Sequence, residues 1–194
     1  MKNLMKNLLL TLCFFCITSS AALTLPARMY DVQVVIFSHI TPTTLQLQQW
    51  PVVSPNVSAQ STPPSGIAYN LQREKNILQK NPQYQILMNA NWKESWVGDQ
   101  STVTIPINID KNNQSLNGVM TITLGHYFDV HTNLSLTEPT ALLQKMAINN
   151  YFSQWNKPNF TFQLLQNRRM RSNELNYIEH PLMGMLIKII PMKR

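Results

Sequence analysis

The residues best suited to binding chemistry lie close together near the C-terminus. Arg168, Arg169 and Arg171 carry planar guanidinium groups, each of which can hold a carboxylate through two parallel hydrogen bonds. On an extended chain Arg169 and Arg171 point to one side, and Arg168 points to the other. We expect one arginine to stabilise the fold by pairing with Glu174 or Glu179, while the pair Arg169 and Arg171 presents outward to an anionic ligand.

Aromatic residues add to this candidate binding surface. Tyr177 and His180 follow the arginines and offer flat faces and polar edges, which suit sugars. Trp96 precedes a Gly-Asp pair and is expected in an exposed loop, whereas Trp92 belongs to an apolar strand face and is expected in the core. The alternative is that the arginine segment is a structural turn held by internal salt bridges. The residue types favour neither reading.

Motifs for catalysis are absent from the sequence. No G-x-S-x-G or H-E-x-x-H pattern occurs, and no pair of carboxylates stands out. His126 and His131 are five residues apart, which places them on opposite faces of a strand. We therefore expect no enzyme activity, no metal site and no cofactor, although a wall hydrolase or transferase is kept as a minor alternative.

The N-terminus reads as a cleaved export signal covering residues 1–22. Lys2 and Lys6 precede an apolar segment at residues 8–17, and small residues lead to a cleavage site after Ala22. This apolar segment is shorter than the ~20 residues that span a bilayer. We expect a bacterial periplasmic protein with no membrane span after cleavage.

Removal of the signal changes the cysteine content and the charge. Cys13 and Cys16 both lie in the signal, so the mature chain has no disulfide framework. Loss of Lys2 and Lys6 lowers the basic residues from 16 to 14 against 9 acidic residues, and the net charge from +7 to +5. The anionic partners in a bacterial envelope are peptidoglycan carboxylates, phospholipid headgroups and lipopolysaccharide, and this compartment disfavours nucleic acid.

Hydrophobic patterning in the first half of the mature chain predicts a strand-helix-strand unit. Residues 30–37 are typical of a buried strand, and residues 67–80 have helical spacing. Residues 84–92 alternate, with Tyr84, Ile86, Met88, Ala90 and Trp92 on one side. This order predicts parallel pairing through a right-handed crossover. The proline-rich residues 41–66 are predicted to form a loop.

The second half alternates in short segments typical of antiparallel strands. These are predicted at residues 102–109, 116–124, 127–136, 160–165 and 183–190. Gly118 is a candidate bulge. Thr137 is a candidate cap for a helix over residues 141–155. The sequence predicts one α+β domain over residues 23–194, with a mixed, mostly antiparallel sheet, the early strand-helix-strand unit and about two helices.

The C-terminal segment carries a family resemblance. Its pattern R-R-M-R-S-x-E-L-x-Y-I-x-H-P-L-x-G-x-L-I spans residues 168–187 and is similar to the C-terminal hallmark of the CsiV family. Weaker support comes from residues 30–37, 84–92, 116–118 and 125–128.

The resemblance implies a non-enzymatic periplasmic protein of Gram-negative bacteria that binds peptidoglycan and maintains cell shape. It also implies support of wall synthesis through a penicillin-binding synthase and its lipoprotein activator, without indicating binding residues. The alternative is a protein–protein adaptor of that synthase and activator that binds glycan weakly or not at all.

Overall fold

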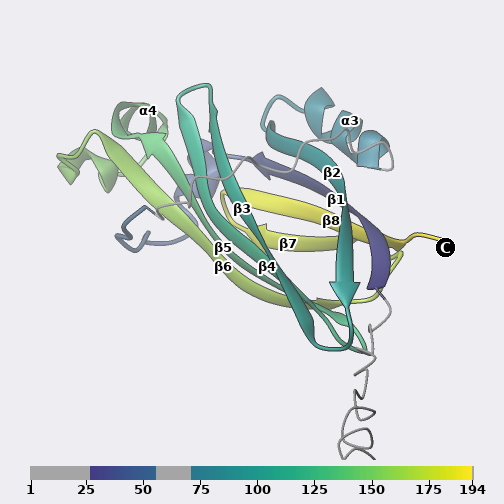
Figure 1. The fold of residues 1–194 in the computed structure, drawn as a ribbon. Helices are drawn as coiled ribbons and strands as arrows, with labels where there is room; N and C mark the ends of the chain where they lie inside the picture. Colours follow the sequence, from purple (N-terminus) through teal and green to yellow (C-terminus); the bar gives the residue numbers. More distant parts are fainter. Residues whose placement is uncertain (1–26, 56–70, 194) are drawn as a thin grey trace, which may run out of the picture.

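The computed structural model describes residues 27–55 and 71–193. The predicted export signal and residues 56–66 of the predicted loop lie outside the described residues. Two four-stranded antiparallel sheets dominate the fold (Figure 1). Sheet A has the order β2 (Gln85–Val97), β1 (Ala27–Ser38), β8 (Met183–Pro191), β7 (Asn176–His180). Sheet B has the order β3 (Ser101–Lys111), β4 (Gln114–Leu124), β5 (Phe128–Pro139), β6 (Asn159–Met170).

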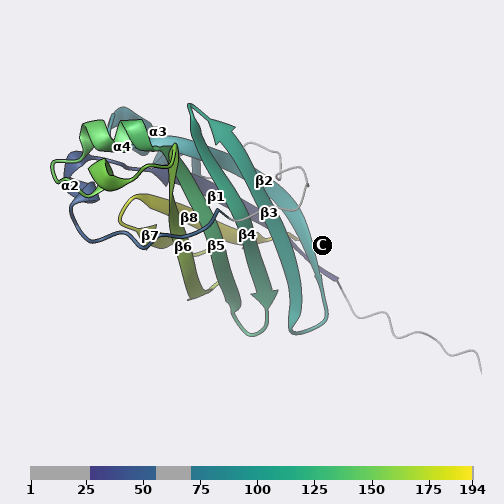
Figure 2. The same cartoon turned by 90° about the vertical axis from the view of Figure 1, so that its left-hand side faces the viewer.

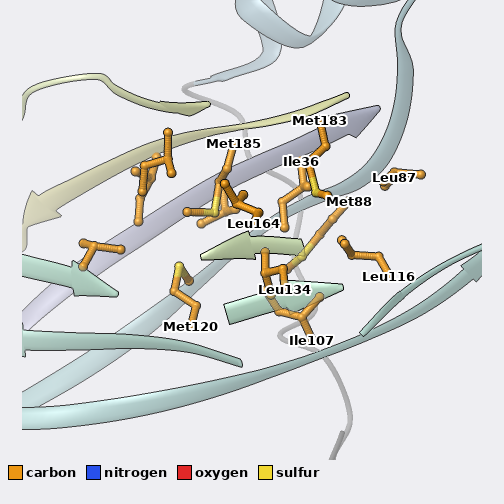
Figure 3. Packing of buried hydrophobic residues seen from close by; sticks show 14 of the residues in the cluster. Ile36, Leu87, Met88, Ile107, Leu116, Met120, Leu134, Leu164, Met183 and Met185 are labelled. Carbon is orange, nitrogen blue, oxygen red and sulfur yellow. The ribbon is translucent and has the colours of Figure 1, made fainter. Parts of the chain in front are cut away.

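The core lies between the two sheets, as alternation along the strands dictates. In β4 every second residue from Gln114 to Leu124 is buried, and the residues between them are partly exposed. Figure 3 shows Ile36, Met183 and Met185 of sheet A directed toward residues of sheet B, such as Leu134 and Leu164. One continuous cluster of buried side chains fills this space, which is consistent with a single domain.

The strands of sheet B pair in chain order, and sheet A joins the first strand of the chain to the last. β3, β4, β5 and β6 pair in succession, and the first strand, β1, pairs with the last, β8. Two short turns, at residues 98–100 and 171–175, carry the chain from one sheet to the other. Positive φ angles of 76° at Gly98 and 63° at Asn173 occur in these turns.

The predicted parallel strand-helix-strand unit is wrong. β1 and β2 are neighbours but pair antiparallel, and all other pairings among the described strands are antiparallel as well. The sheet is therefore not mixed, and the domain is mostly β. Because β1 and β2 are antiparallel neighbours, no right-handed crossover is required.

A bulge explains why one face of β2 was predicted incorrectly. The β1–β2 register shifts between Ile36 and Phe37, so Leu87 has no direct partner. Met88 and Ala90 consequently face the core between the sheets. Ile86 and Tyr84 pack in a second cluster on the outer face of sheet A.

Three α-helices occur among the described residues: α2 (Pro42–Leu45), α3 (Gln72–Lys80) and α4 (Thr140–Met146). Leu71 and Leu78 place α3 against the outer cluster of sheet A. Figure 2 shows α2 and α4 together at one end of the sheets. No helix in the described part of the chain is long and apolar enough to cross a membrane.

Two local predictions for this end of the molecule are wrong. The predicted loop contains α2, capped by Thr41, and its Trp50 is buried at 3% exposure. The predicted helix over residues 141–155 is interrupted: α4 ends at Met146, and a short 3-10 helix follows at Phe152–Gln154. The helix does not start at Thr137 because β5 continues to Pro139 and pairs with β6 there.

Candidate functional site

The C-terminal arginines lie where the chain passes from sheet B to sheet A. Arg168 and Arg169 are near the end of β6, Arg171 begins the turn, and β7 follows. β6 and β7 are edge strands of different sheets and do not pair with each other. The candidate site is therefore an open seam between two sheet edges, which we call the β6–β7 seam and define by Gln166, Asn167, Arg168, Tyr177, Ile178 and Glu179.

Arg169 and Arg171 are engaged with neighbouring side chains. Arg169 Nε donates to Asp129 Oδ1 at 2.9 Å, and Asp129 raises the pKa of Arg169. Arg171 Nη1 lies 3.9 Å from Glu174 Oε1. The two guanidinium groups lie 5.8 Å and 5.7 Å from the centre of the Tyr127 ring. The prediction that they face the same side is confirmed. The prediction that this pair stays free of the fold is wrong, because both arginines pair with acidic side chains.

Arg168 differs from its two neighbours. It is exposed, and no ion pair joins it to any residue in the described ranges. It pairs in register with Val130, whose side chain is in the core, so Arg168 lies on the core side of β6. Sheet A does not cover this position, and the side chain lines the β6–β7 seam with Tyr177 and Glu179.

Tyr177 lies on β7 beside the same seam, and its ring packs on the outer face of sheet A. Its ring stacks on Phe37 with centroids 6.2 Å apart and planes 5° from parallel, while 40% of the residue stays exposed. Gly184 makes this packing possible, because a Cβ there would lie 2.6 Å from atoms of both rings. Burial, together with Glu179 and Tyr84, raises the pKa of Tyr177 and keeps its hydroxyl protonated.

His180 lies at the end of β7 and is only partly exposed. Its ring is 5.6 Å from that of Trp50, and its Nδ1 accepts a hydrogen bond from the Leu182 backbone N–H at 3.2 Å. Burial, with a smaller contribution from His39, lowers the pKa of His180 to about 4. A neutral imidazole can contribute hydrogen bonds, but it adds no positive charge to the site at neutral pH.

The prediction of an exposed Trp96 is wrong. Trp96 is 0% exposed, its Nε1 donates to the Ile122 carbonyl at 3.2 Å, and Tyr30 and Phe128 contact its ring edge-on. β2 extends to Val97, which carries Trp96 into the core. Trp92 is partly buried against the core, as predicted.

Two neighbours of the arginines were not predicted from the sequence. Tyr127 and Asp129 lie about 40 residues earlier in the chain, but the β5–β6 pairing places Asp129 opposite Arg169. Arg28 forms an ion pair with Asp99 and lines a hollow with Arg171 and Tyr127. Only a correct prediction of strand register would have revealed these contacts.

His126 and His131, the two histidines considered as metal ligands, lie in different local structures. His126 lies in the turn before β5, and His131 is exposed on the strand. No group of three or more His, Cys, Asp or Glu side chains in the described ranges is arranged to hold a metal ion.

The fold is a two-sheet β domain, and its β6–β7 seam exposes Arg168 beside Tyr177. The chain belongs to the CsiV family: the family model described as "Peptidoglycan-binding protein, CsiV" matches residues 58–192. The resemblance of the C-terminal segment is thereby confirmed. The description names binding and no reaction. Neither the curated proteins nor the solved structures contain a match to the chain.

Proposed function

We propose that this protein is a non-enzymatic periplasmic factor that binds peptidoglycan through the β6–β7 seam. Membership of a peptidoglycan-binding family carries the proposal. Arg168 would hold a carboxylate of the peptide stem, and the exposed part of Tyr177 would contact a sugar ring. The neighbouring amides Gln166 and Asn167 supply both donors and acceptors.

The site chemistry favours Arg168 over the other arginines as the main contact. Arg169 and Arg171 would have to break their ion pairs with Asp129 and Glu174 before binding a ligand carboxylate. Arg168 has no ion-pair partner among the described residues to give up. These exposed ion pairs are weak, so Arg169 and Arg171 remain candidate contacts of lesser effect. His180 remains a candidate as a neutral hydrogen-bonding group.

Co-sedimentation with purified sacculi tests the proposal. The mature protein, residues 23–194, should pellet with sacculi at moderate salt, and protein that stays wholly in the supernatant would contradict the proposal. Arg168→Ala should weaken binding at least about tenfold, since a hydrogen bond to a charged group contributes roughly 1.5–3 kcal/mol. Its melting temperature should stay unchanged, because Arg168 is exposed.

Arg169→Ala is the matched control, because it removes the same charge one residue away. It should weaken binding less than Arg168→Ala. Equal losses in the two variants would mean that net charge, and not the seam, attracts the wall. Release of muropeptides from the sacculi would show that the protein is an enzyme.

We further propose that wall binding supports cell-wall synthesis and cell shape together with a penicillin-binding synthase and its lipoprotein activator. This follows from the family resemblance. Crosslinking in cells, followed by purification of this protein, should recover the synthase. Recovery of the synthase by a variant that no longer binds sacculi would favour the adaptor alternative.

A further inference from the structure

A second hollow lies at the other end of β6, away from the arginines. It is formed by the segment after α2 and by the segment between α4 and β6, and its volume is about 540 Å³. Gln48 and Gln49 line it from the first segment, and Asn150 and Gln154 from the second. These four residues are exposed, and their side-chain amides make no hydrogen bond to any residue the structure describes.

Two aromatic rings complete the hollow and are held in fixed positions. The Tyr151 hydroxyl donates to the Trp50 carbonyl, and Trp155 Nε1 donates to the Asn159 carbonyl at 2.9 Å. Both rings also contact Phe160 edge-on, with centroids 6.2 Å and 5.0 Å away. The rings are thus ordered before any ligand arrives, which lowers the entropic cost of binding.

The segment that carries these rings is fixed to α4 as well. Gln144 Nε2 donates to the Phe152 carbonyl at 3.0 Å, and Phe152 is fully buried. The rings therefore stand on a rigid base, while the amides around them are free to turn. This is the arrangement expected of a binding site, in which anchored rings set position and adaptable polar groups set orientation.

The described lining of this hollow contains no charged side chain, which restricts the class of ligand. The lining itself offers no cation to a phosphate or carboxylate, and Lys157, whose Nζ lies 5.5 Å from the centre of the Trp155 ring, is not part of it. Side-chain amides both donate and accept hydrogen bonds, which matches hydroxyl and acetamide groups. The electron-rich face of an aromatic ring attracts the C–H face of a sugar. We infer that this hollow is a second site that binds an uncharged stretch of an N-acetylated sugar chain.

The inference deepens the proposed function and rests on it in one respect: the natural ligand would be the glycan strand of peptidoglycan. β6 joins the two sites. The nine steps along the strand from Asn159 to Arg168 span about 30 Å at the rise of an extended strand. The arginine seam would then contact peptide stems, and the amide hollow would contact the sugar backbone.

Titration with the uncharged β-1,4-linked tetramer of N-acetylglucosamine tests the inference, with binding followed by NMR of the mature protein. The tetramer should shift the side-chain amide signals of Asn150 and Gln154 and the indole signal of Trp155. The double variant Asn150→Ala/Gln154→Ala should bind about fivefold more weakly, since neutral hydrogen bonds are lost. Both residues are exposed, so the variant should keep the wild-type melting temperature.

Asn108→Ala, which removes an exposed side-chain amide on β3 outside both sites, should bind the tetramer as the wild type does. A glucose tetramer, which lacks the acetamide groups, should bind more weakly. Absence of tetramer binding, or equal binding by the double variant, would overturn the inference. If the tetramer does not bind but sacculi still pellet, the proposed function stands and the second site is rejected. If the tetramer binds while sacculi do not pellet, only the proposed function fails.

Discussion

At the scale of single residues, neighbours across the sheet decide what each arginine can do. Arg168 and Arg169 are adjacent in sequence and have the same chemistry, yet Arg169 faces Asp129 and Arg168 faces the seam. The structural reading therefore applies to Arg169 and Arg171, and the contact-surface reading stays a prediction for Arg168. Arg169 and Arg171 link side chains of the fold, and Arg168 is the candidate contact.

Glu138 is a second residue whose surroundings set its chemistry. It is 0% exposed at the end of β5, and neither carboxylate oxygen has a well-formed hydrogen bond within the described residues. Burial raises the pKa of Glu138 to about 8, and the nearby Gln114 amide offsets only part of this effect. Ser38 donates to Gln114 Oε1 at 3.2 Å, so a small polar group lies inside an otherwise apolar core.

The contribution of Glu138 to stability should therefore fall as pH rises between about 4.5 and about 8. In this window the folded protein keeps the Glu138 proton while the unfolded chain releases it, at a cost of about 1.4 kcal/mol per pH unit. Glu138→Gln should be more stable than the wild type at pH 7.5 and nearly equal at pH 4.5. Urea unfolding across this range measures the difference. His180, whose pKa is lowered, contributes equally to both proteins. Parallel stability profiles for the two would contradict the prediction.

At the scale of elements, periodicity predicted the strands well and the helices poorly. Strands β3 to β5 alternate because one face of each covers the core, and this pattern is visible in the sequence. Residues 141–155 also have helical spacing, but Leu143 and Phe152 reach the core from two short helices separated by a turn. Spacing alone cannot show that a helix is interrupted.

Gly118 permits the close contact between β4 and β5. The register on both sides continues through it without a shift, so the predicted bulge is wrong. Its φ is 144°, and a Cβ there would lie 2.1 Å from the Asn133 carbonyl oxygen. Gly118→Ala should therefore lower the free energy of unfolding by about 2 kcal/mol or more, because backbone atoms would have to move.

Gly125→Ala is the control for that substitution. Its Cβ would meet only the end of the flexible Gln100 side chain, so denaturant unfolding should show a loss well below that of Gly118→Ala. A wild-type midpoint for Gly118→Ala would contradict the close approach of the two strands.

At the scale of the whole molecule, the pairing of β1 with β8 joins the two ends of the described chain. Met183, Met185, Ile187 and Ile189 of β8 are fully buried in the main core. β8 also lies between β1 and β7, so its loss would leave β7 unpaired.

A chain truncated after Pro181 should therefore fail to fold. Circular dichroism should show loss of the β-sheet signal and of cooperative thermal unfolding. A truncation after Pro191 keeps β8 intact and should unfold close to the wild-type temperature. Cooperative unfolding of the shorter chain would show that the remaining seven strands are sufficient.

The sequence by itself determined the main strands, the family and the basic segment near the C-terminus, because each depends on local spacing or on a short pattern. Only the tertiary structure decided that β1 and β2 are antiparallel, that Trp96 is buried and that Asp129 meets Arg169. These outcomes depend on register and on sheet-to-sheet packing, which join residues distant in the chain. The same long-range packing places Arg168 in the seam, away from the acidic partners of Arg169 and Arg171. It also forms the amide hollow beside Trp155.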